Sequence, residues 1–500
     1  MCPHIGRRVE ATSSEVKGYY SRLVPSAAKR LSSRDEERLI RLGESMRYVS
    51  QREGTLTPRV GFTYFGQFVG HDLSHDTTPL ARSHPVAERV PNYRSAYLSL
   101  EQIYGGGPMR SPQLFEGESG AEVFRIGKTP KGRPRDLPIE AGEVLSADER
   151  NLDNLILRQL HVVFLKFHNE AVKQLSATPP TIKGADSIGS GTIFERAQRL
   201  VRWHYQWIVR HDFLPRVLHN SFWFNRDRGY PLDSDSIPTE FSLAAHRFGH
   251  SMVRPAYGLN CRRKRVEISE LMSLGHERAP VGDDFLIEWG RFFDGLPRSG
   301  PVASSSYLDT ALAPAMHRLP ESILRLCVRD EVSDSPASLP IRTLLRGARA
   351  CLPSGQEVAA LLSKKGILAA RYELTPDQLV QDVCNQSGTV LGDTELHENT
   401  PLFYYILKEA EIVGQGRTLG PVGSYIVGQV IRTALYSDPD GYLSAIGPNW
   451  QLPQWRFPSG SIGKVNSLIG VIRLVGDAEL LPECDAKRRS LPLESLLSQR

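Results

Sequence analysis

Apolar positions along the chain recur mainly at intervals of three and four residues, the spacing of one buried helical face. Two long stretches, 150–170 and 193–218, show this spacing. Their apolar positions are Leu152, Leu155, Ile156, Leu160, Val163, Phe164 and Phe167 in the first, and Phe194, Ala197, Leu200, Val201, Tyr205 and Ile208 in the second. Strand-like alternation is scarce and short. The pattern predicts a mainly α-helical protein with little β-structure.

Proline and glycine mark the breaks in this helical pattern. Pro340 suits the first turn of a helix that ends before Pro353. Stretches rich in glycine, proline and serine at 104–120, 177–191 and 296–306 predict long surface loops rather than domain linkers. With no internal repeat, we expect one large domain over 36–477, an N-terminal arm over 1–35 and a C-terminal tail over 478–500.

Composition narrows the class only slightly. A chain of 500 residues with 40% hydrophobic and 23% charged positions is an ordinary globular protein with room for a large core. The net charge of +5 gives no support for a nucleic-acid partner. No apolar run approaches the ~20 residues of a membrane span, and the first residues lack the apolar region of a secretory signal. We therefore expect no membrane span and a cytoplasmic location; the sequence carries no signal for the oligomeric state.

The six cysteines form no CxxC pair and no metal-ligand spacing. In a chain of this length such usage is typical of reduced thiols rather than of a disulfide framework. This expectation also favours an intracellular protein.

The stretch Phe65–Asp76 concentrates candidate chemistry, since it reads FGQFVGHDLSHD. If it is helical, Gln67 and His71 stand four residues apart and share one face. Apolar neighbours would keep His71 neutral near pH 7 and able to carry a proton for a bound substrate. For a single histidine, a core helix with a merely hydrogen-bonded imidazole would be the simpler interpretation. His71 and His75 also have the spacing of a metal pair, but no third ligand is identifiable.

Three further segments accompany this one in a fixed order. They are DERNLDNLILRQLHVVFLKFHN at 148–169, FSLAAHRFGHSMVRP at 241–255 and LPIRTLLRGARACLPSGQ at 339–356. Together the four segments resemble the animal-type haem peroxidase superfamily, which includes myeloperoxidase and peroxidasin, over roughly residues 35–475. The stretches TPLFYYILKEAE at 400–411 and LGPVGSYIV at 419–427 are most similar to its bacterial branch.

The resemblance implies a single large helical domain that holds haem b between a distal and a proximal helix. On the distal side it implies His71 as the acid–base residue, Arg150 as the cation beside the peroxide oxygens, and Gln67 as a partner of distal water or a halide. By itself, an arginine between acids at a helix start would be a surface ion pair. The implied reaction reduces hydrogen peroxide or an organic hydroperoxide and oxidises a small-molecule donor or a halide.

On the proximal side the resemblance implies His250 as the axial ligand of the haem iron. Gly249 would let the backbone approach the porphyrin closely. Arg247 and Arg346 fall where family members contact the haem propionates, which suits charge-assisted hydrogen bonds.

Three positions depart from the family pattern. Gly70 stands where many members carry an acid that forms an ester to the haem, and the second ester position holds the short Asp153. We therefore expect one covalent link to the haem, or none. Thr343 replaces the asparagine that orients the proximal histidine; its hydroxyl can still accept a hydrogen bond.

A calcium site is a further expectation from the resemblance. Its ligands would be Asp72 together with Ser95, Tyr97, Ser99 and Glu101. Calcium prefers six to eight oxygens, several of them charged, so two carboxylates would bind it weakly. Alternatively, Asp72 is simply tied into hydrogen bonds near the haem.

Other functions stay open at this point. His246 and His250 could form a zinc pair, but Arg247 between them does not fit HExxH. In fatty-acid oxygenases of the same fold, a radical-carrying tyrosine occupies the position of Arg247. A haem-free relative that serves as a binding protein is the remaining alternative.

Overall fold

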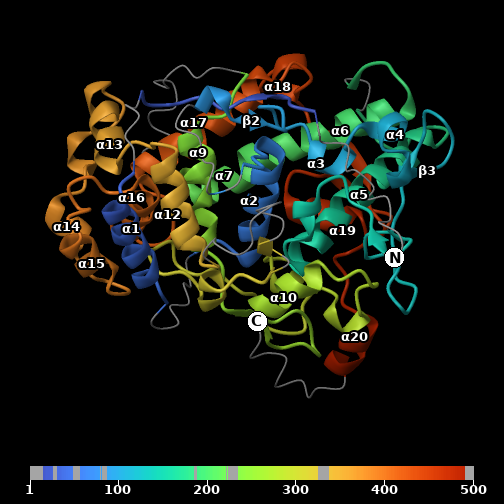
Figure 1. Cartoon of the computed structure of the whole chain (residues 1–500). Coiled ribbons are helices and arrows are strands. Elements are labelled where there is room, and N and C mark those ends of the chain that lie inside the picture. Colours follow the sequence, from blue (N-terminus) through green and yellow to red (C-terminus); the bar gives the residue numbers. More distant parts are fainter. Residues whose placement is uncertain are drawn as a thin grey trace, which may run out of the picture.

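Helices dominate the structure (Figure 1), a computed structural model that describes residues 15–25, 31–48, 57–78, 80, 87–184, 188–220, 222, 235–321, 323–324 and 337–489. The α-helices are α1 (Ser33–Ser45), α2 (Val60–Leu73), α3 (Glu101–Tyr104), α4 (Gly107–Arg110), α5 (Leu155–Ser176), α6 (Ile193–Ile208), α7 (Leu214–Val217), α9 (Thr239–Leu243), α10 (Ile268–Gly275), α12 (Leu339–Arg349), α13 (Gly355–Lys364), α14 (Pro376–Val380), α15 (Ser387–Asp393), α16 (Leu402–Ile412), α17 (Pro421–Ser437), α18 (Tyr442–Ala445), α19 (Leu468–Leu474) and α20 (Pro482–Arg489).

Short 3-10 segments connect many of these helices, and one segment is a π-turn. The 3-10 segments are η2 (Ala87–Arg89), η3 (Pro112–Leu114), η4 (Glu149–Leu152), η8 (Ala245–His250), η9 (Asp283–Phe285), η10 (Trp289–Arg291), η11 (Pro314–His317) and η12 (Ala370–Tyr372), and the π-turn is η6 (Val209–Phe213).

The strands within the described ranges form only two-stranded antiparallel sheets, so the mainly α-helical prediction is confirmed. The pairs are β1 (Gly18–Tyr19) with β2 (Pro91–Asn92), β3 (Phe115–Glu116) with β4 (Val123–Phe124), β5 (Ile139–Glu140) with β6 (Glu143–Val144), β7 (Ala256–Tyr257) with β8 (Val266–Glu267), and β9 (Gln454–Arg456) with β10 (Ile462–Lys464).

Helix α2 lies near the centre of the molecule in Figure 1, between α12 and α9 on one side and α5 on the other. It is apolar around most of its circumference, as expected of a helix that packs on nearly all sides. The ring of Phe68 stacks on Phe164 of α5 with centroids 4.6 Å apart, and Phe65 meets Tyr205 of α6 edge-on at 6.1 Å. This aromatic cluster fixes α2 against the two longest neighbouring helices.

The two predicted helical stretches form, with local breaks. Residues 150–152 belong to the 3-10 segment η4, and α5 begins only at Leu155, where the Asn154 side chain accepts the Leu157 N–H at 2.8 Å. The second stretch is divided into α6, η6 and α7. Pro215 stands in the first turn of α7 and has no N–H to continue the α-helical ladder, which explains the break.

Part of the predicted N-terminal arm packs against the rest of the protein. Tyr20 and Leu23 are buried, and the Glu240 carboxylate accepts the Leu23 N–H at 3.0 Å. Residues 1–14 and 26–30 of the predicted arm and 490–500 of the predicted tail lie outside the described residues.

A disulfide joins Cys261, just after β7, to Cys484 in α20, with the Cα atoms 5.5 Å apart. The prediction of reduced thiols was therefore wrong for this pair. The two cysteines are separated by 223 positions, so no local spacing could reveal their pairing. Next to the disulfide, Arg133 donates to Glu483 at 2.8 and 3.2 Å and fastens α20 to the loop before β5.

Reducing this disulfide should lower the free energy of unfolding by about 2–5 kcal/mol, because the unfolded chain would regain the freedom of a very long closed loop. Thermal or denaturant unfolding with and without a reductant measures the change. The double variant C261S/C484S is the matched control, since it should melt at the lower value in both conditions. Equal melting of the wild type with and without reductant would contradict the prediction.

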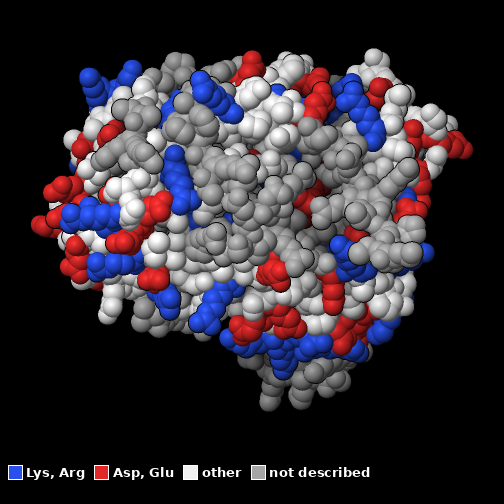
Figure 2. Space-filling view, in the orientation of Figure 1, with Lys and Arg blue, Asp and Glu red and all other residues white. Residues whose placement is uncertain are grey.

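The charge on the described surface and the apolar character of the described helices agree with the expectations from composition. Basic and acidic side chains are interspersed on the described surface in Figure 2, in line with 61 basic and 56 acidic residues. Over the described part of the chain, the structure contains no helix with the length and apolar character needed to cross a bilayer.

Candidate functional site

Helix α2 exposes two side chains, Gln67 and His71, whereas its twelve other residues are buried. The two lie four positions apart and so share one face, as the sequence predicted. Gly66 and Gly70, on another face, allow neighbouring segments to approach the helix closely. The mostly apolar sequence thus buries α2 except along the face that carries Gln67 and His71.

Arg150 closes the carboxyl end of α2. Its Nη1 donates to the Ser74 carbonyl at 2.6 Å, and its Nη2 donates to the His71 carbonyl at 2.8 Å. A cation at this end of a helix satisfies carbonyls that lack helical partners and complements the helix dipole. The guanidinium is therefore held beside His71, where the distal role predicted for both residues would place it.

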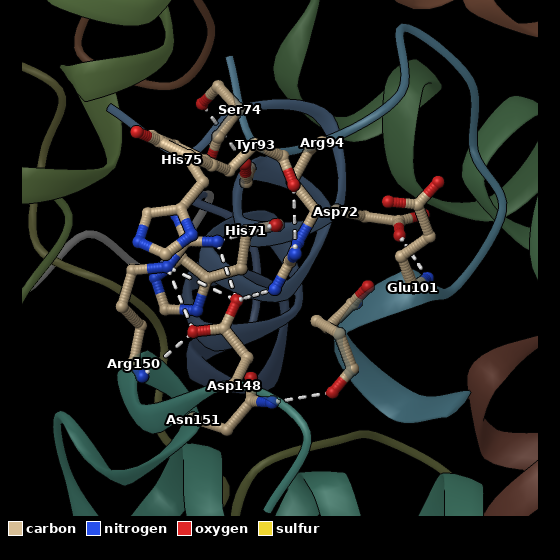
Figure 3. Close-up of polar contacts among 12 residues, drawn as sticks. His71, Asp72, Ser74, His75, Tyr93, Arg94, Glu101, Asp148, Arg150 and Asn151 are labelled. Carbon is tan, nitrogen blue, oxygen red and sulfur yellow. Dashed lines mark hydrogen bonds and ion pairs between the residues drawn. The ribbon is translucent and has the colours of Figure 1, made fainter. Parts of the chain in front are cut away.

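The Asp148 carboxylate lies against the guanidinium group of Arg150 and holds it in place, as Figure 3 shows. Its fully buried carboxylate accepts from Nη2 of Arg150 at 2.6 Å and from Nη2 of Arg94 at 2.5 Å. Burial alone would raise the pKa of Asp148, but the two guanidinium groups outweigh it and hold that pKa well below its usual value. Arg150 thus belongs to a buried ionic triad and not to the surface ion pair that its flanking acids suggested.

His71 is neutral in this surrounding. Burial lowers its pKa well below the usual value, and the adjacent Arg150 lowers it further against the opposing effect of Asp148. Its Nδ1 is buried without a hydrogen-bond partner within the described ranges. The imidazole is therefore in the form that can accept a proton.

Asp153 and Gln67 complete the distal group. Asp153 lies 3.7 Å through Oδ2 from Nε2 of His71, and the same oxygen accepts from Nε2 of Gln67 at 3.0 Å. Asn154 donates to the Gln67 side-chain oxygen at 3.1 Å and so fixes the amide's orientation. Burial raises the pKa of Asp153 to about 7, against the effect of Arg150.

The proximal candidate His250 ends the 3-10 segment η8, which packs against α2. Its Nδ1 is buried and has no hydrogen-bond partner in the described part of the chain, and its ring lies 6.4 Å from that of Phe403 in α16. Burial, followed by Arg247, lowers its pKa to about 3, so the imidazole is neutral. A side chain at Gly249 would meet no described atom within 4 Å, which leaves open space beside this turn.

Thr343 differs from its expected role. Its hydroxyl accepts from Nη1 of Arg247 at 3.3 Å, while Nδ1 of His250 is left without a partner among the described residues. A hydroxyl is shorter than the asparagine side chain that the family pattern implies at this position. In the structure Thr343 therefore positions Arg247 and does not orient His250.

The two arginines predicted to bind propionates both have protein partners. Arg247 also donates through Nε to the Ser242 carbonyl at 3.1 Å. Arg346 of α12 donates to Asp76 at 3.1 Å and to the Thr78 carbonyl at 3.0 Å, and so links α12 to the segment that follows α2. Their predicted contact with propionates stays a prediction.

His246 explains the missing acid at Gly70. Its Nε2 lies 2.9 Å from the Gly66 carbonyl, and a Cβ at Gly70 would stand only 2.4 Å from the same nitrogen. An acid at that position would displace the imidazole. Because η8 has about three residues per turn, His246 and His250 point about 120° apart around its axis, which excludes the zinc pair.

The predicted calcium ligand Asp72 is occupied by backbone donors. Its Oδ2 accepts the Leu100 N–H and its Oδ1 the Glu101 N–H, both at 3.0 Å. Burial raises the pKa of Asp72 to about 7. The alternative interpretation, that this carboxylate serves hydrogen bonding, matches the structure.

Three of the remaining calcium candidates bond to one another. The Ser95 and Ser99 hydroxyls are 3.1 Å apart, and Ser99 donates to Glu101 at 3.4 Å. Over the described ranges, no group of three or more His, Cys, Asp or Glu side chains is arranged to hold a metal ion. Calcium binding through Asp72, Glu101, the two serines and the Tyr97 carbonyl stays a prediction.

Sequence reasoning missed three members of the site: Asp148, Arg94 and His246. Asp148 had a local signal, since an aspartate before a 3-10 segment caps it, and its side chain accepts the Arg150 N–H at 2.9 Å. Arg94 had none, because 54 positions separate it from Asp148. His246 was noticed only as a possible metal ligand.

Residues 80–280 match the family model described as animal haem peroxidase. This region contains Arg150, Asp153 and His250, and it begins after His71.

Curated relatives match over part of their length. The chain is 28% identical over 195 residues to the "Peroxidase-like protein" of Margaritifera margaritifera, which covers 36% of this chain and 24% of that protein. It is 27% identical over 249 residues to "Peroxidase mlt-7" of Caenorhabditis elegans, which covers 46% of this chain and 30% of that protein. The chain thus aligns with less than a third of the length of these relatives.

Solved structures share the fold over nearly the whole chain. Peroxidase A from Dictyostelium discoideum superposes with a TM-score of 0.60 at 13% identity, covering 95% of this chain and 94% of that one. A fatty acid α-dioxygenase from Oryza sativa gives a TM-score of 0.59 at 12% identity, covering 94% of this chain and 81% of that one.

The fold, together with the two imidazoles of His71 and His250, defines the class. This is a helical protein with the haem peroxidase fold. Residues 80–280 match the animal haem peroxidase model, and that family implies haem as the cofactor.

The residues present fit a haem. Both His71 and His250 carry a buried Nδ1 without a partner among the described residues, a costly arrangement unless a bound group completes it. The open space at Gly249 lies beside His250. His250 is the residue that would hold the iron.

Proposed function

We propose that this chain is a haem-dependent peroxidase that reduces hydrogen peroxide or an organic hydroperoxide and oxidises a small donor or a halide. One observation carries the proposal: two neutral imidazoles, His71 and His250, stand on the packed segments α2 and η8. The family match over 80–280 supports it, since relatives in that family are named as peroxidases.

His250 and His71 have separate roles in the proposed reaction. A haem, when bound, supplies the iron and the electrons for cleaving the O–O bond. His250 would hold the iron through a neutral imidazole, the form that ligates metal. His71 takes a proton from the substrate on the distal side, as its neutral state allows.

Arg150 contributes a fixed charge. Four of its five N–H donors are engaged by Asp148 and by the carbonyls of His71 and Ser74. These bonds hold the guanidinium in place, so it stabilises negative charge that develops near His71 without having to reorient.

A fatty-acid dioxygenase is the second candidate, because the fold matches such an enzyme as closely as it matches a peroxidase. The position three residues before His250, where oxygenases of this fold carry a radical-forming tyrosine, holds Arg247. Its side chain bonds to Ser242 and Thr343. An arginine cannot form such a radical, so we favour the peroxidase.

The absorption spectrum of the purified protein tests the proposal. A Soret band that shifts when hydrogen peroxide is added, followed by oxidation of a one-electron donor, is the expected result. Oxygen uptake with a fatty acid and no peroxide would favour the dioxygenase. A protein that takes up no haem on reconstitution would be a haem-free binding protein.

A further inference from the structure

The distal group consists of Gln67, His71, Arg150 and Asp153. The Asp153 carboxyl group lies at its edge and remains partly exposed. Asp153 caps the end of η4, where its N–H donates to the Arg150 carbonyl at 3.1 Å. Its side chain retains 22% of its exposure and meets both polar side chains of the open face of α2, Gln67 at 3.0 Å and His71 at 3.7 Å. The carboxyl group therefore faces the same space as the acid–base histidine.

The neighbouring acid Asp148 cannot change its charge in the same way. It is fully buried between Arg150 and Arg94, and both guanidinium groups stabilise its ionised form. Among the described residues, the Asp153 carboxyl group accepts its side-chain hydrogen bond from the neutral Gln67 amide, and no guanidinium group donates to it. Of the two carboxyl groups, Asp153 is the one that can gain or lose a proton.

We propose that Asp153 remains a free acid and stores the substrate proton, so that His71 and Asp153 work as one acid–base pair. This inference rests on the proposed peroxidase function and deepens it. The peroxide loses a proton to Nε2 of His71 and is left as an anion. Because Nε2 of His71 and Oδ2 of Asp153 are 3.7 Å apart, the proton passes on through one water molecule to Asp153, which becomes neutral. It returns by the same route through His71 to the departing oxygen, which leaves as water.

Charge explains why the proton should move on from His71. A protonated imidazole would lie beside the guanidinium of Arg150, which is bound to the His71 carbonyl, and the two positive charges would repel. Transfer to Asp153 removes both that repulsion and a negative charge near Asp148 and Glu149. The pKa of Asp153, raised by burial to about 7 with Arg150 opposing and Asp148 and Glu149 assisting, suits a group that exchanges protons near neutrality.

The same geometry separates this role from haem attachment. An ester through Asp153 would consume the carboxyl group and leave no proton-storing acid. If the proposal holds, haem should therefore leave the denatured protein completely, even after turnover with peroxide. Denaturing mass spectrometry detects any remaining bond.

The experiment compares the haem-loaded wild type with D153N, D153E and the control E116Q, which removes an exposed charge of β3. Stopped-flow spectroscopy follows the reaction with hydrogen peroxide from pH 5 to 9. The wild-type rate should rise with pH through about 7, because Asp153 must be ionised to receive the proton. D153N should react at least ~10-fold more slowly and lose that rise, D153E should recover most of both, and E116Q should match the wild type.

A second measurement does not depend on activity. Infrared spectra of protein labelled with ¹³C at the aspartate carboxyl group should show a neutral carboxyl band at pH 6 that fades by pH 8 and is missing in D153N. Wild-type rates and pH profile in D153N, or a haem ester at Asp153, would overturn the proton-storing role while leaving the peroxidase intact. A wild type that binds haem but ignores peroxide would overturn the proposed function and this inference together.

Discussion

His71→Ala should bind haem like the wild type and react with hydrogen peroxide at least ~100-fold more slowly, the lower range for loss of a general acid–base group. The imidazole is neutral, partly exposed along the open face of α2 and lacks a hydrogen-bond partner at Nδ1 within the described ranges. Its removal takes away the proton acceptor while the helix stays packed. Stopped-flow spectroscopy of the haem-loaded variant measures the rate.

His211→Ala is the matched control, since this exposed histidine of η6 packs against the ring of Trp207. A rate in His71→Ala within a few-fold of this control would rule out the proposed mechanism. Arg150→Ala is a poorer test, because it strips the buried Asp148 of one of its two guanidinium partners and so threatens the fold.

His250→Ala should lose stable haem binding, with the haem-to-protein ratio falling from near one to near zero. No other described imidazole combines an unpaired Nδ1 with the open space beside Gly249. Absorbance of the Soret band per protein after reconstitution and gel filtration measures the ratio. Far-UV circular dichroism checks that the variant has folded.

His246→Ala provides the control for the proximal site. Its imidazole contacts α2 at Gly66 and Gly70, so this variant should retain the haem and the spectrum of the wild type. If His250→Ala kept full haem content with an unchanged ferric spectrum while His246→Ala lost it, the assignment of the axial ligand would be reversed.

The parts of the fold that depend on local pattern could be predicted from the sequence. The helical stretch around Gln67 and His71 and the open face these residues share followed from spacing and apolar neighbours alone. The order of four family-like segments added the fold and the candidate roles, and the family match and fold comparisons agree with that class.

The parts that depend on distant contacts could not be predicted. The ionic triad needs Arg94, and the fit of His246 over Gly70 joins segments far apart in the chain. Spacing also gave no hint that η8 is a 3-10 turn, in which residues four apart no longer share a face. The Thr343 hydroxyl could accept a hydrogen bond from His250, but it accepts one from the Arg247 guanidinium instead.

The covalent link between Cys261 and Cys484 has a practical consequence for every assay named above. Thiol reagents such as dithiothreitol are common additives and are themselves oxidised by peroxide, so in this protein they would consume substrate and open the link between α20 and the β7 region at once. Recombinant material from a reducing host compartment would begin in that opened state. Activity and melting data are therefore comparable only between preparations whose thiol content has been titrated.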